Sequence, residues 1–506
     1  REDQHERRHV RRAGQVQAAV GRSTAKPVGV GIEVGHRDAE ALEERAGPQD
    51  RRMLDGRGHE VAAGLAPGGG DIDIDNAASD IGTLAIDAAG SSVFLYADTV
   101  GSVGDVDGVQ GIQANDLALI VANGDIDISD GAAANDIDVS SQAAIAAQGG
   151  NITGAGTIVV PELILWAPNN GSIELTSINN DVDVLSAGTS ATITELSSFI
   201  FEDIDDLTVG TVSYAAFGAP ASGIRTAALN LTANGLLTID ALSSIATTST
   251  GAFNLFADDM AIAGQIDSSG GTVTLETATS GNAIDLGASP DTLANGILEL
   301  SDAELDNIFA GVLTIGDETT TGGITISSDI QPANVNTIHL KAGGNITASA
   351  ASLTGDKNLA ITNTGNVTFD SGATDVFSLA VDSDGDVVFH DIDDLQISDI
   401  DGVAGVTGVN IDLRSLTSYV YNQSSIAASG TGDINIYAAW FYYADTVGDL
   451  TGGSGDITIS GDEIYLFNGN VSGTGNLLIQ QVNDSQTMGL GDAAAGWLNL
   501  DSSELA

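Results

Sequence analysis

Carboxylates at alternate positions are the residues of this chain best suited to bind a metal ion. Asp382, Asp384 and Asp386 lie in the run Asp-Ser-Asp-Gly-Asp and offer hard oxygen ligands, as a Ca²⁺-binding loop does. The run departs from an EF-hand, which would need Gly in place of Val387 and Glu in place of Asp393. The same residues also fall on a regular turn, and turn chemistry alone accounts for them. Calcium is therefore the one cofactor that the sequence suggests. The alternative to specific binding is diffuse screening of the negative charge by divalent cations.

Residues suited to acid–base or nucleophilic catalysis are sparse. Acidic residues such as Asp71 and Asp73 alternate with Ile, which places them on the solvated face of strands. After Gly70 the only histidines are His339 and His390, and no nucleophile, zinc or phosphate-binding motif accompanies them. We therefore expect no enzymatic activity. The alternative is a polysaccharide hydrolase built on a parallel β-helix, which would need paired carboxyl groups in one cleft.

Aromatic residues gather in one segment of a chain that is only 5% aromatic. They are Tyr437, Trp440, Phe441, Tyr442 and Tyr443. Because consecutive residues of a strand face opposite ways, some of these rings must face outward. Exposed rings can stack on sugars or dock on a neighbouring molecule, so these residues are a candidate contact site for a ligand or partner. Packing of the rings beneath a loop is the alternative.

A short, regular repeat organises the second half of the chain. Each copy is a Gly, a small or polar residue and then strand-forming residues. The copies begin at Gly323, Gly344, Gly365 and Gly385, and again at Gly432, Gly455 and Gly475. Gly408-Val409-Asn410-Ile411 lies near the middle of the gap between the two series. A second strand series shares this period: Ile338-His339-Leu340, Leu359-Ala360-Ile361 and Leu379-Ala380-Val381.

This period predicts an all-β protein, a parallel β-helix (β-solenoid) with coils of about 20–24 residues. Inward Val, Ile and Leu would stack into one core, while Gly, Asn and Asp would occupy the turns. The chain after Gly70 would supply roughly 20 coils, and parallel strand spacing would make a rod on the order of 100 Å long. One exception is Ser301–Ala310 (SDAELDNIFA), which could form a helical turn or two.

The charge distribution divides the chain in two. Residues 1–68 hold 12 of the 16 basic residues, whereas the remainder has four basic and 59 acidic residues. The change occurs at Ala66-Pro67-Gly68-Gly69-Gly70. We therefore expect an Arg-rich tail at 1–68, either disordered or not native coding sequence, and a solenoid at 69–506.

Bulk properties exclude several classes of protein. The formal net charge of −54 would repel nucleic acids and anionic lipids, so we expect no nucleic-acid partner. No stretch of about 20 apolar residues is present, so no transmembrane helix is expected. The chain has no cysteine, which excludes disulfide scaffolds. No signal peptide opens the sequence.

Longer sequence motifs also recur. Phe201-Glu202-Asp203-Ile204-Asp205-Asp206-Leu207 returns as Phe389-His390-Asp391-Ile392-Asp393-Asp394-Leu395. The segment Leu298–Leu305 returns as Leu498–Leu505, close to the last residue. The solenoid would then end within a repeat unit, so we expect the chain to be part of a longer protein.

The wording of Leu298–Asp317 (LELSDAELDNIFAGVLTIGD), followed by Gly322–Ile330 (GGITISSDI), resembles repeats of large bacterial exoproteins of the filamentous haemagglutinin and adhesin kind. The resemblance covers nearly everything after about Asp71. It implies a right-handed parallel β-helix that is secreted or held at the bacterial cell surface. Its function would be structural or adhesive, and its partners would be host or neighbouring cell surfaces, glycans or matrix and the rest of a longer exoprotein. A calcium-stiffened exoprotein segment is a compatible alternative.

Overall fold

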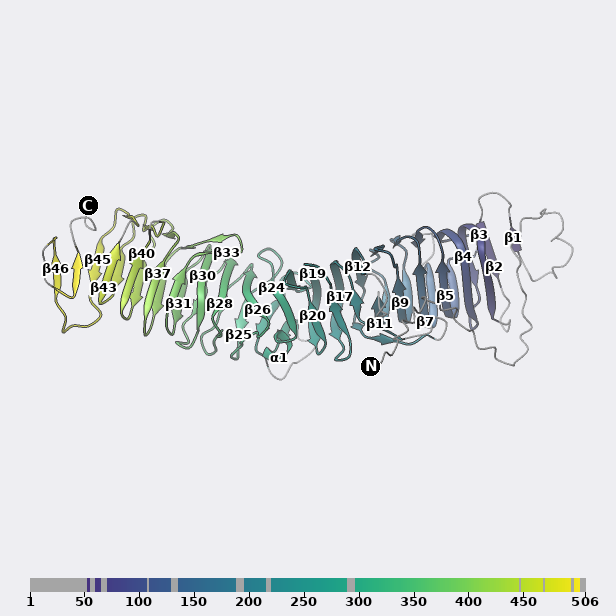
Figure 1. Ribbon diagram of the computed structural model, residues 1–506, viewed down its shortest axis with the longest axis horizontal. Helices are drawn as coiled ribbons and strands as arrows, with labels where there is room; N and C mark the ends of the chain where they lie inside the picture. Colours follow the sequence, from purple (N-terminus) through teal and green to yellow (C-terminus); the bar gives the residue numbers. More distant parts are fainter. Residues whose placement is uncertain are drawn as a thin grey trace, which may run out of the picture.

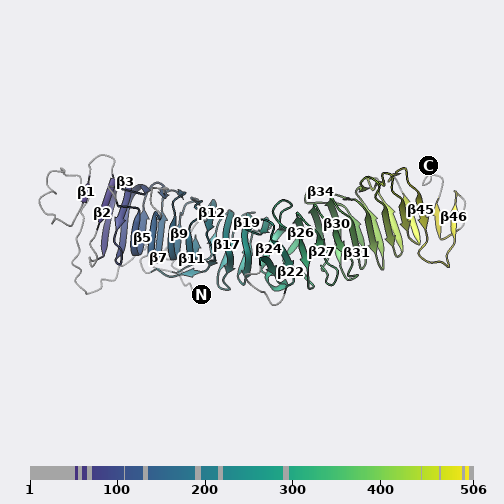
Figure 2. The ribbon, with the colours of Figure 1, turned by 180° about the vertical axis from the view of Figure 1, so that it is seen from behind.

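Parallel coils stacked along one axis form most of the described chain. The computed structural model describes residues 52–54, 60–64 and 71–500, except 107–108, 129–134, 188–194, 215–219, 289–295, 446, 467–468 and 493–495. The coils form an elongated rod, with the chain advancing steadily from one end to the other (Figure 1). The view from behind shows the same succession of coils (Figure 2). The predicted all-β solenoid is therefore confirmed.

Two long ladders and three small pairs contain the described strands, and the pairings within the two ladders are parallel except for the antiparallel pair β1–β2. The larger ladder comprises β1 (Arg52–Leu54), β2 (Glu60–Gly64), β3 (Ile72–Asp87), β4 (Ser92–Val103), β5 (Ile112–Val121), β6 (Ile126–Ile128), β7 (Ile137–Ala147), β8 (Ile152–Gly154), β9 (Ile158–Trp166), β10 (Ser172–Leu175), β11 (Asp181–Ala187), β12 (Ser198–Asp203), β13 (Leu207–Val209), β16 (Ile224–Arg225), β17 (Ala228–Ile239), β18 (Ser244–Ala246), β19 (Ala252–Ile262), β20 (Gln265–Asp267), β21 (Thr272–Glu276), β24 (Ile308–Ile315), β26 (Val335–Ala342), β28 (Lys357–Asn363), β30 (Val376–Ser383), β32 (Leu395–Ile397), β35 (Val406–Gly408), β37 (Tyr419–Asn422), β38 (Ile426–Ala428), β40 (Phe441–Ala444), β41 (Leu450–Thr451), β43 (Glu463–Leu466) and β44 (Val471–Ser472).

The second ladder and the pairs complete the set. The second ladder comprises β23 (Ile297–Leu300), β22 (Ala283–Leu286), β25 (Ile324–Ile326), β27 (Ile346–Thr347), β29 (Val367–Phe369), β31 (Val387–Asp391), β36 (Ile411–Ser415), β39 (Ile434–Ala438), β42 (Ile457–Ser460) and β45 (Leu477–Gln480). The pairs are β14 (Thr211–Val212) with β15 (Ala221–Ser222), β33 (Asp399–Ile400) with β34 (Val403–Ala404), and β46 (Met488–Leu490) with β47 (Leu498–Leu500).

The strand registers follow the spacing read from the sequence. Ile338 pairs with Leu359, and Leu359 with Leu379, so the second strand series forms one ladder. The glycine series does the same in the second ladder. Val387 pairs with Ile411, which begins a strand of the next coil. Asn410 directly precedes Ile411 and lies in the turn between the two halves of the glycine series. The gap between Gly385 and Gly432 therefore holds two coils, as the sequence predicted.

The rod has about 16 turns rather than roughly 20, because some coils are longer than the predicted period. Phe201 pairs with Leu231, and Val273 pairs with Leu313, so each of these coils takes up more of the chain than a regular one. At the spacing of parallel strands the stack is on the order of 80 Å long, shorter than predicted.

The core is a continuous column of stacked aliphatic side chains. Buried positions alternate with more exposed ones along many strands, as in β12, where Phe199 and Phe201 are buried. One cluster of buried residues extends from Ile72 to Leu500. Since each strand presents the same inward positions to the next coil, burial of Val, Ile and Leu drives the stacking.

The long coil between Val273 and Leu313 holds the one helix among the described residues. Helix α1 (Asp302–Leu305) begins at Ser301, whose side chain and that of Glu304 form a reciprocal capping box. The helical turn expected within Ser301–Ala310 is confirmed for α1, and the segment returns to a strand at Ile308. In this coil β23 lies before β22 in the ladder, although it follows β22 in sequence.

Strand pairing begins before the composition boundary. Strand β2 pairs in parallel with β3, with Glu60 opposite Thr83. Residues 1–51, 55–59 and 65–70 lie outside the described residues, so the predicted tail at 1–68 stays a prediction. Strand register does not depend on the hand of the coil, so the right hand that the resemblance implies stays a prediction.

Two β-hairpins leave the coils in equivalent ways. Strand β11 pairs first with β13 and then with β16, and the hairpin β14–β15 lies between these two segments. Strand β30 likewise pairs with β32 and then with β35, and the hairpin β33–β34 lies between. The second hairpin follows one margin of the rod in Figure 1 and packs on Ala360 and Ala380 of earlier coils. The first packs on Ala144 and Ile164.

Candidate functional site

The predicted calcium ligands engage the neighbouring coil. The exposed Asp382 carboxylate accepts a hydrogen bond of 2.7 Å from the hydroxyl of Thr407. Asp386 accepts bonds from the backbone amide and the side chain of Asn410, at 3.1 and 2.7 Å. Asp384 is exposed. Calcium binding by Asp382, Asp384 and Asp386 therefore stays a prediction, and these contacts give Asp386 a role in the turn.

Asp386 is one rung of a ladder of turn residues. In each pair, the side-chain Oδ1 of one coil accepts the backbone N–H of the equivalent residue in the next coil, at 2.7 to 3.1 Å. The rungs are Asn345, Asn366, Asp386, Asn410, Asp433, Asp456 and Asn476. The ladder explains why Asn or Asp recurs at this place in the repeat, because either side chain supplies the acceptor.

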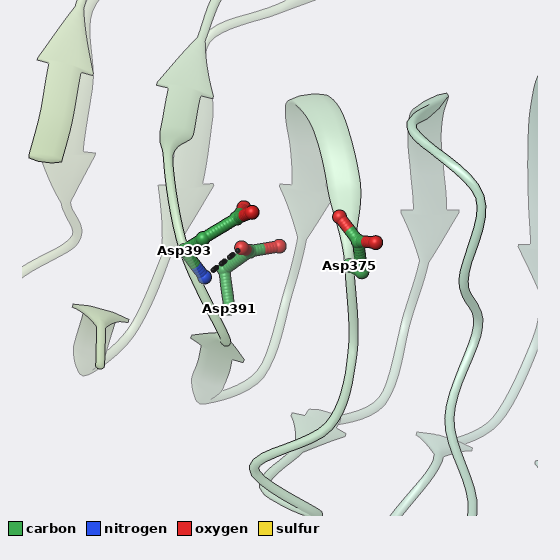
Figure 3. Close-up of side chains that lie close together, drawn as sticks. All are labelled: Asp375, Asp391 and Asp393. Carbon is green, nitrogen blue, oxygen red and sulfur yellow. Dashed lines mark hydrogen bonds between the residues drawn. The ribbon is translucent and has the colours of Figure 1, made fainter. Parts of the chain in front are cut away.

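Three other carboxylates form the closest acidic cluster in the described part of the chain. Asp375, Asp391 and Asp393 each offer an oxygen, and these three oxygens lie within 4.8 Å of one another. Asp391 ends β31 and Asp393 follows in the turn, whereas Asp375 precedes β30 of the adjacent coil (Figure 3). We refer to these residues as the acidic triad.

Asp391 is the centre of the acidic triad and is fully buried. One carboxylate oxygen accepts the amide of Val376 at 2.9 Å, and the other accepts the amide of Asp393 at 2.9 Å. The first bond joins two coils and the second closes the turn. The backbone adds a third link, in which the amide of Ile392 donates to the carbonyl of Thr374. The side chain thus fastens one coil to the next.

Burial raises the pKa of Asp391 to about 7, although its two amide hydrogen bonds oppose this shift. Burial also raises the pKa of Asp375, and the nearby Asp356 and Asp393 add repulsion. One oxygen of Asp375 is buried without a hydrogen-bond partner. Asp391 and Asp375 therefore hold protons more readily than ordinary surface carboxyls do.

The same arrangement recurs earlier in the chain. Asp203 is fully buried and accepts the amides of Val182 and Asp205, at 3.0 and 3.2 Å. Burial raises the pKa of Asp203 to about 7, and Asp205 and Asp181 add repulsion. Asp181, Asp203 and Asp205 therefore correspond to Asp375, Asp391 and Asp393. Each set is followed by one of the two hairpins, so the chain contains a duplicated structural module.

The chemistry open to the acidic triad is limited by burial. Its hard oxygen donors suit a divalent cation such as Ca²⁺. A hydrolase would instead need two carboxyl groups that reach a substrate. Asp391 does not reach one, because it is fully buried and both its oxygens accept backbone amides. The geometry fits a fastening between coils.

Sequence reasoning did not find the acidic triad, although a signal was present. The phrase containing Asp203 and Asp205 repeats as the phrase containing Asp391 and Asp393. The recurrence of Asp at matching places of a duplicated phrase could have marked these residues. Asp375 carries no such signal, because it lies outside the phrase and reaches the others only through coil stacking.

The two histidines have separate surroundings. His339 is buried, its Nδ1 lies 2.8 Å from Asp401 of the hairpin β33–β34, and its Nε2 lies 3.0 Å from the hydroxyl of Thr362. Burial lowers the pKa of His339, although the bond to Asp401 opposes this. Nε2 of His390 lies 3.8 Å from Asp412.

The aromatic residues divide between the core and the surface. Tyr442 is fully buried, and the side chain of Asn422 lies 3.3 Å from its hydroxyl. Phe441 and Tyr443 point outward, as the alternation predicted, and Trp440 is 62% exposed. Tyr437 lies on β39, on the second ladder, beside Arg414. Tyr442 is therefore in the core, and Tyr437 faces outward on a different ladder from Trp440, Phe441 and Tyr443.

No family model, curated protein or solved structure matches this chain. In the described residues, no helix has the length and apolar character needed to cross a membrane.

Proposed function

We propose that this chain is a structural and adhesive stalk segment of a secreted or cell-surface bacterial exoprotein of the filamentous haemagglutinin and adhesin kind. The observation that supports the proposal is the unbroken stack of parallel coils, about 16 turns with a single continuous core. Such a stack resists bending because every coil is hydrogen-bonded to its neighbours along its length. A stalk needs this property, since it must hold a contact surface away from its base.

The surface chemistry is consistent with an extracellular rod. The net charge of −54 keeps copies of the chain apart and soluble. Outward turn positions carry Asn and Asp, which the turn ladder uses for bonds between coils. The sequence of Leu298–Asp317 supports an adhesin in particular, because it resembles repeats of such proteins. We infer that attachment or matrix formation proceeds without catalysis.

Two measurements test the proposal. Antibodies raised against the purified full chain are applied to intact and permeabilised cells of the producing bacterium, and we expect labelling of intact cells. The purified chain is also coated on beads and mixed with polysaccharides, and we expect attachment without release of new reducing ends. Labelling only after permeabilisation would contradict the surface location. Release of reducing ends would favour the hydrolase alternative.

A further inference from the structure

Six outward-facing rings form a continuous platform near the C-terminal end of the rod. Tyr419 and Tyr421 come from β37, Phe441 and Tyr443 from β40, and Tyr465 from β43. Trp440 precedes β40. We call these six residues the aromatic platform: Tyr419, Tyr421, Trp440, Phe441, Tyr443 and Tyr465. Four of the eight tyrosines of the whole chain belong to the platform, so the platform concentrates a scarce residue type.

Strand register sets the rings in rows along the rod axis. Tyr421, Tyr443 and Tyr465 occupy equivalent positions in three successive coils, and Tyr419 and Phe441 form a second row beside them. Ring centroids in adjacent coils lie 5.0 Å apart for Phe441 and Tyr465 and 6.4 Å apart for Tyr421 and Tyr443. Rings within a strand are similarly close, and these are ordinary aromatic contact distances.

The platform faces solvent. Trp440 is 62% exposed and Tyr465 is 45% exposed. Trp440 packs edge-on against Tyr419, with centroids 6.2 Å apart, which fixes its orientation while leaving its surface open. Contiguous exposed apolar surface rimmed by polar groups marks interaction sites in soluble proteins.

The charges around the platform restrict what can occupy it. Asp394 lies close enough to Tyr421 to contribute to the raised pKa of its hydroxyl, for which burial is the larger cause. Glu463 continues the row of Phe441. The four basic residues after Gly70 include one nearby, Arg414, which lies on the second ladder and is paired with Asp412 at 2.8 Å. A polyanion would therefore be repelled, and so would a second copy of this acidic chain.

We propose that the aromatic platform binds an uncharged polysaccharide whose chain runs along the rod axis. A pyranose ring has an apolar C–H face that packs on an aromatic ring, and rows of rings over three coils can hold successive sugars. Asp394 and Glu463 at the rim can accept hydrogen bonds from sugar hydroxyls. In the row of Tyr421, the preceding coil presents Gln396, whose amide can both donate to and accept from hydroxyls. This inference rests on the proposed adhesive function and names its ligand class.

The test is affinity electrophoresis of the full chain through gels that contain a neutral β-glucan, alginate as a polyanion, or no polysaccharide. We expect retardation by the neutral glucan and none by alginate. The variant Trp440→Ala/Tyr465→Ala should bind the glucan at least tenfold more weakly while keeping the wild-type circular dichroism spectrum. The matched control is Trp497→Ala, because Trp497 is 65% exposed but lies outside the platform.

Three outcomes would overturn the inference. Undiminished retardation of the double variant would show that glucan binds elsewhere. Stronger retardation by alginate would contradict the charge argument. Platform-dependent self-association in sedimentation, without glucan binding, would assign the rings to contacts between copies. The gel assay does not depend on where the protein is located, so its failure is distinguishable from failure of the cell-labelling test.

Discussion

At the scale of single residues, two buried aspartates join neighbouring coils at equivalent points of the rod. Asp203 and Asp391 each accept two backbone amides, one from the preceding coil and one from their own turn. A carboxyl group in such a place is costly to ionise, because burial removes its hydration. Its protonation therefore becomes part of the stability of the stack.

The stability of the rod should fall as pH rises from 6 to 8. Below about pH 3.8 the two carboxyls are protonated in both the folded and the unfolded chain. Their contribution to the free energy of unfolding is then fully present. As pH rises, the unfolded chain ionises first, and the contribution is lost completely once pH exceeds about 7. Each carboxyl group should lower the free energy of unfolding by about 1 kcal/mol between pH 6 and 8. Urea unfolding midpoints measure the trend.

The variant Asp203→Asn/Asp391→Asn should reduce this pH dependence, because its amides do not titrate, and part of the slope should remain because burial also raises the pKa of Glu276 to about 7. Asp240→Asn is the matched control, since Asp240 is exposed and lies apart from both clusters. Ordinary carboxyls are already ionised at pH 6, so they contribute little slope in this window. An unchanged slope in the double variant would contradict the role given to Asp203 and Asp391.

At the scale of elements, close approach of turns limits which residues the repeat accepts. A Cβ at Gly455 would overlap the backbone carbonyl of Gly432 in the preceding coil. Gly455→Ala should therefore push two coils apart and cost about 2 kcal/mol, an overpacking penalty. Gly104→Ala is the control, because its Cβ would meet only the side chain of Thr83, at 3.8 Å. Thermal melts of both variants test this, and equal melts would contradict it.

The hairpin β33–β34 is a second element with a testable anchor. Asp401→Ala removes the partner of Nδ1 on the buried His339, and an unsatisfied buried polar atom costs about 1–3 kcal/mol. We expect the hairpin to detach more often from Ala360 and Ala380, so that proteinase K cleaves within 399–404 faster than in the wild type. Asp370→Ala is the control, because Asp370 is exposed. Equal cleavage rates would show that apolar packing alone holds the hairpin.

At the scale of the whole molecule, charge sets the response to cations. A net charge of −54 along a narrow rod creates repulsion that added cations screen. We expect Ca²⁺ and Mg²⁺ at equal millimolar concentrations to raise the thermal midpoint by similar amounts. Asp382→Asn/Asp384→Asn should leave this equality unchanged. A rise selective for Ca²⁺ and lost in that variant would instead assign a specific calcium site to the turn.

The period, the fold class and the register of the regular coils could be predicted from the amino-acid sequence. Since each coil packs only on its neighbours, the spacing of Gly344, Gly365 and Gly385 predicts which residues pair between these successive coils. The alternation of inward and outward residues also follows from the chain alone, which is why outward rings at Phe441 and Tyr443 could be predicted.

Which side chains meet across different coils depends on the tertiary structure. Asp375 joins Asp391, and Tyr465 joins Phe441, because specific coils lie in register, and no local pattern specifies that. His339 meets Asp401, far along the chain, because a hairpin folds back over earlier coils. Contacts within a repeat are set by local spacing, whereas contacts from insertions depend on where the inserted chain packs.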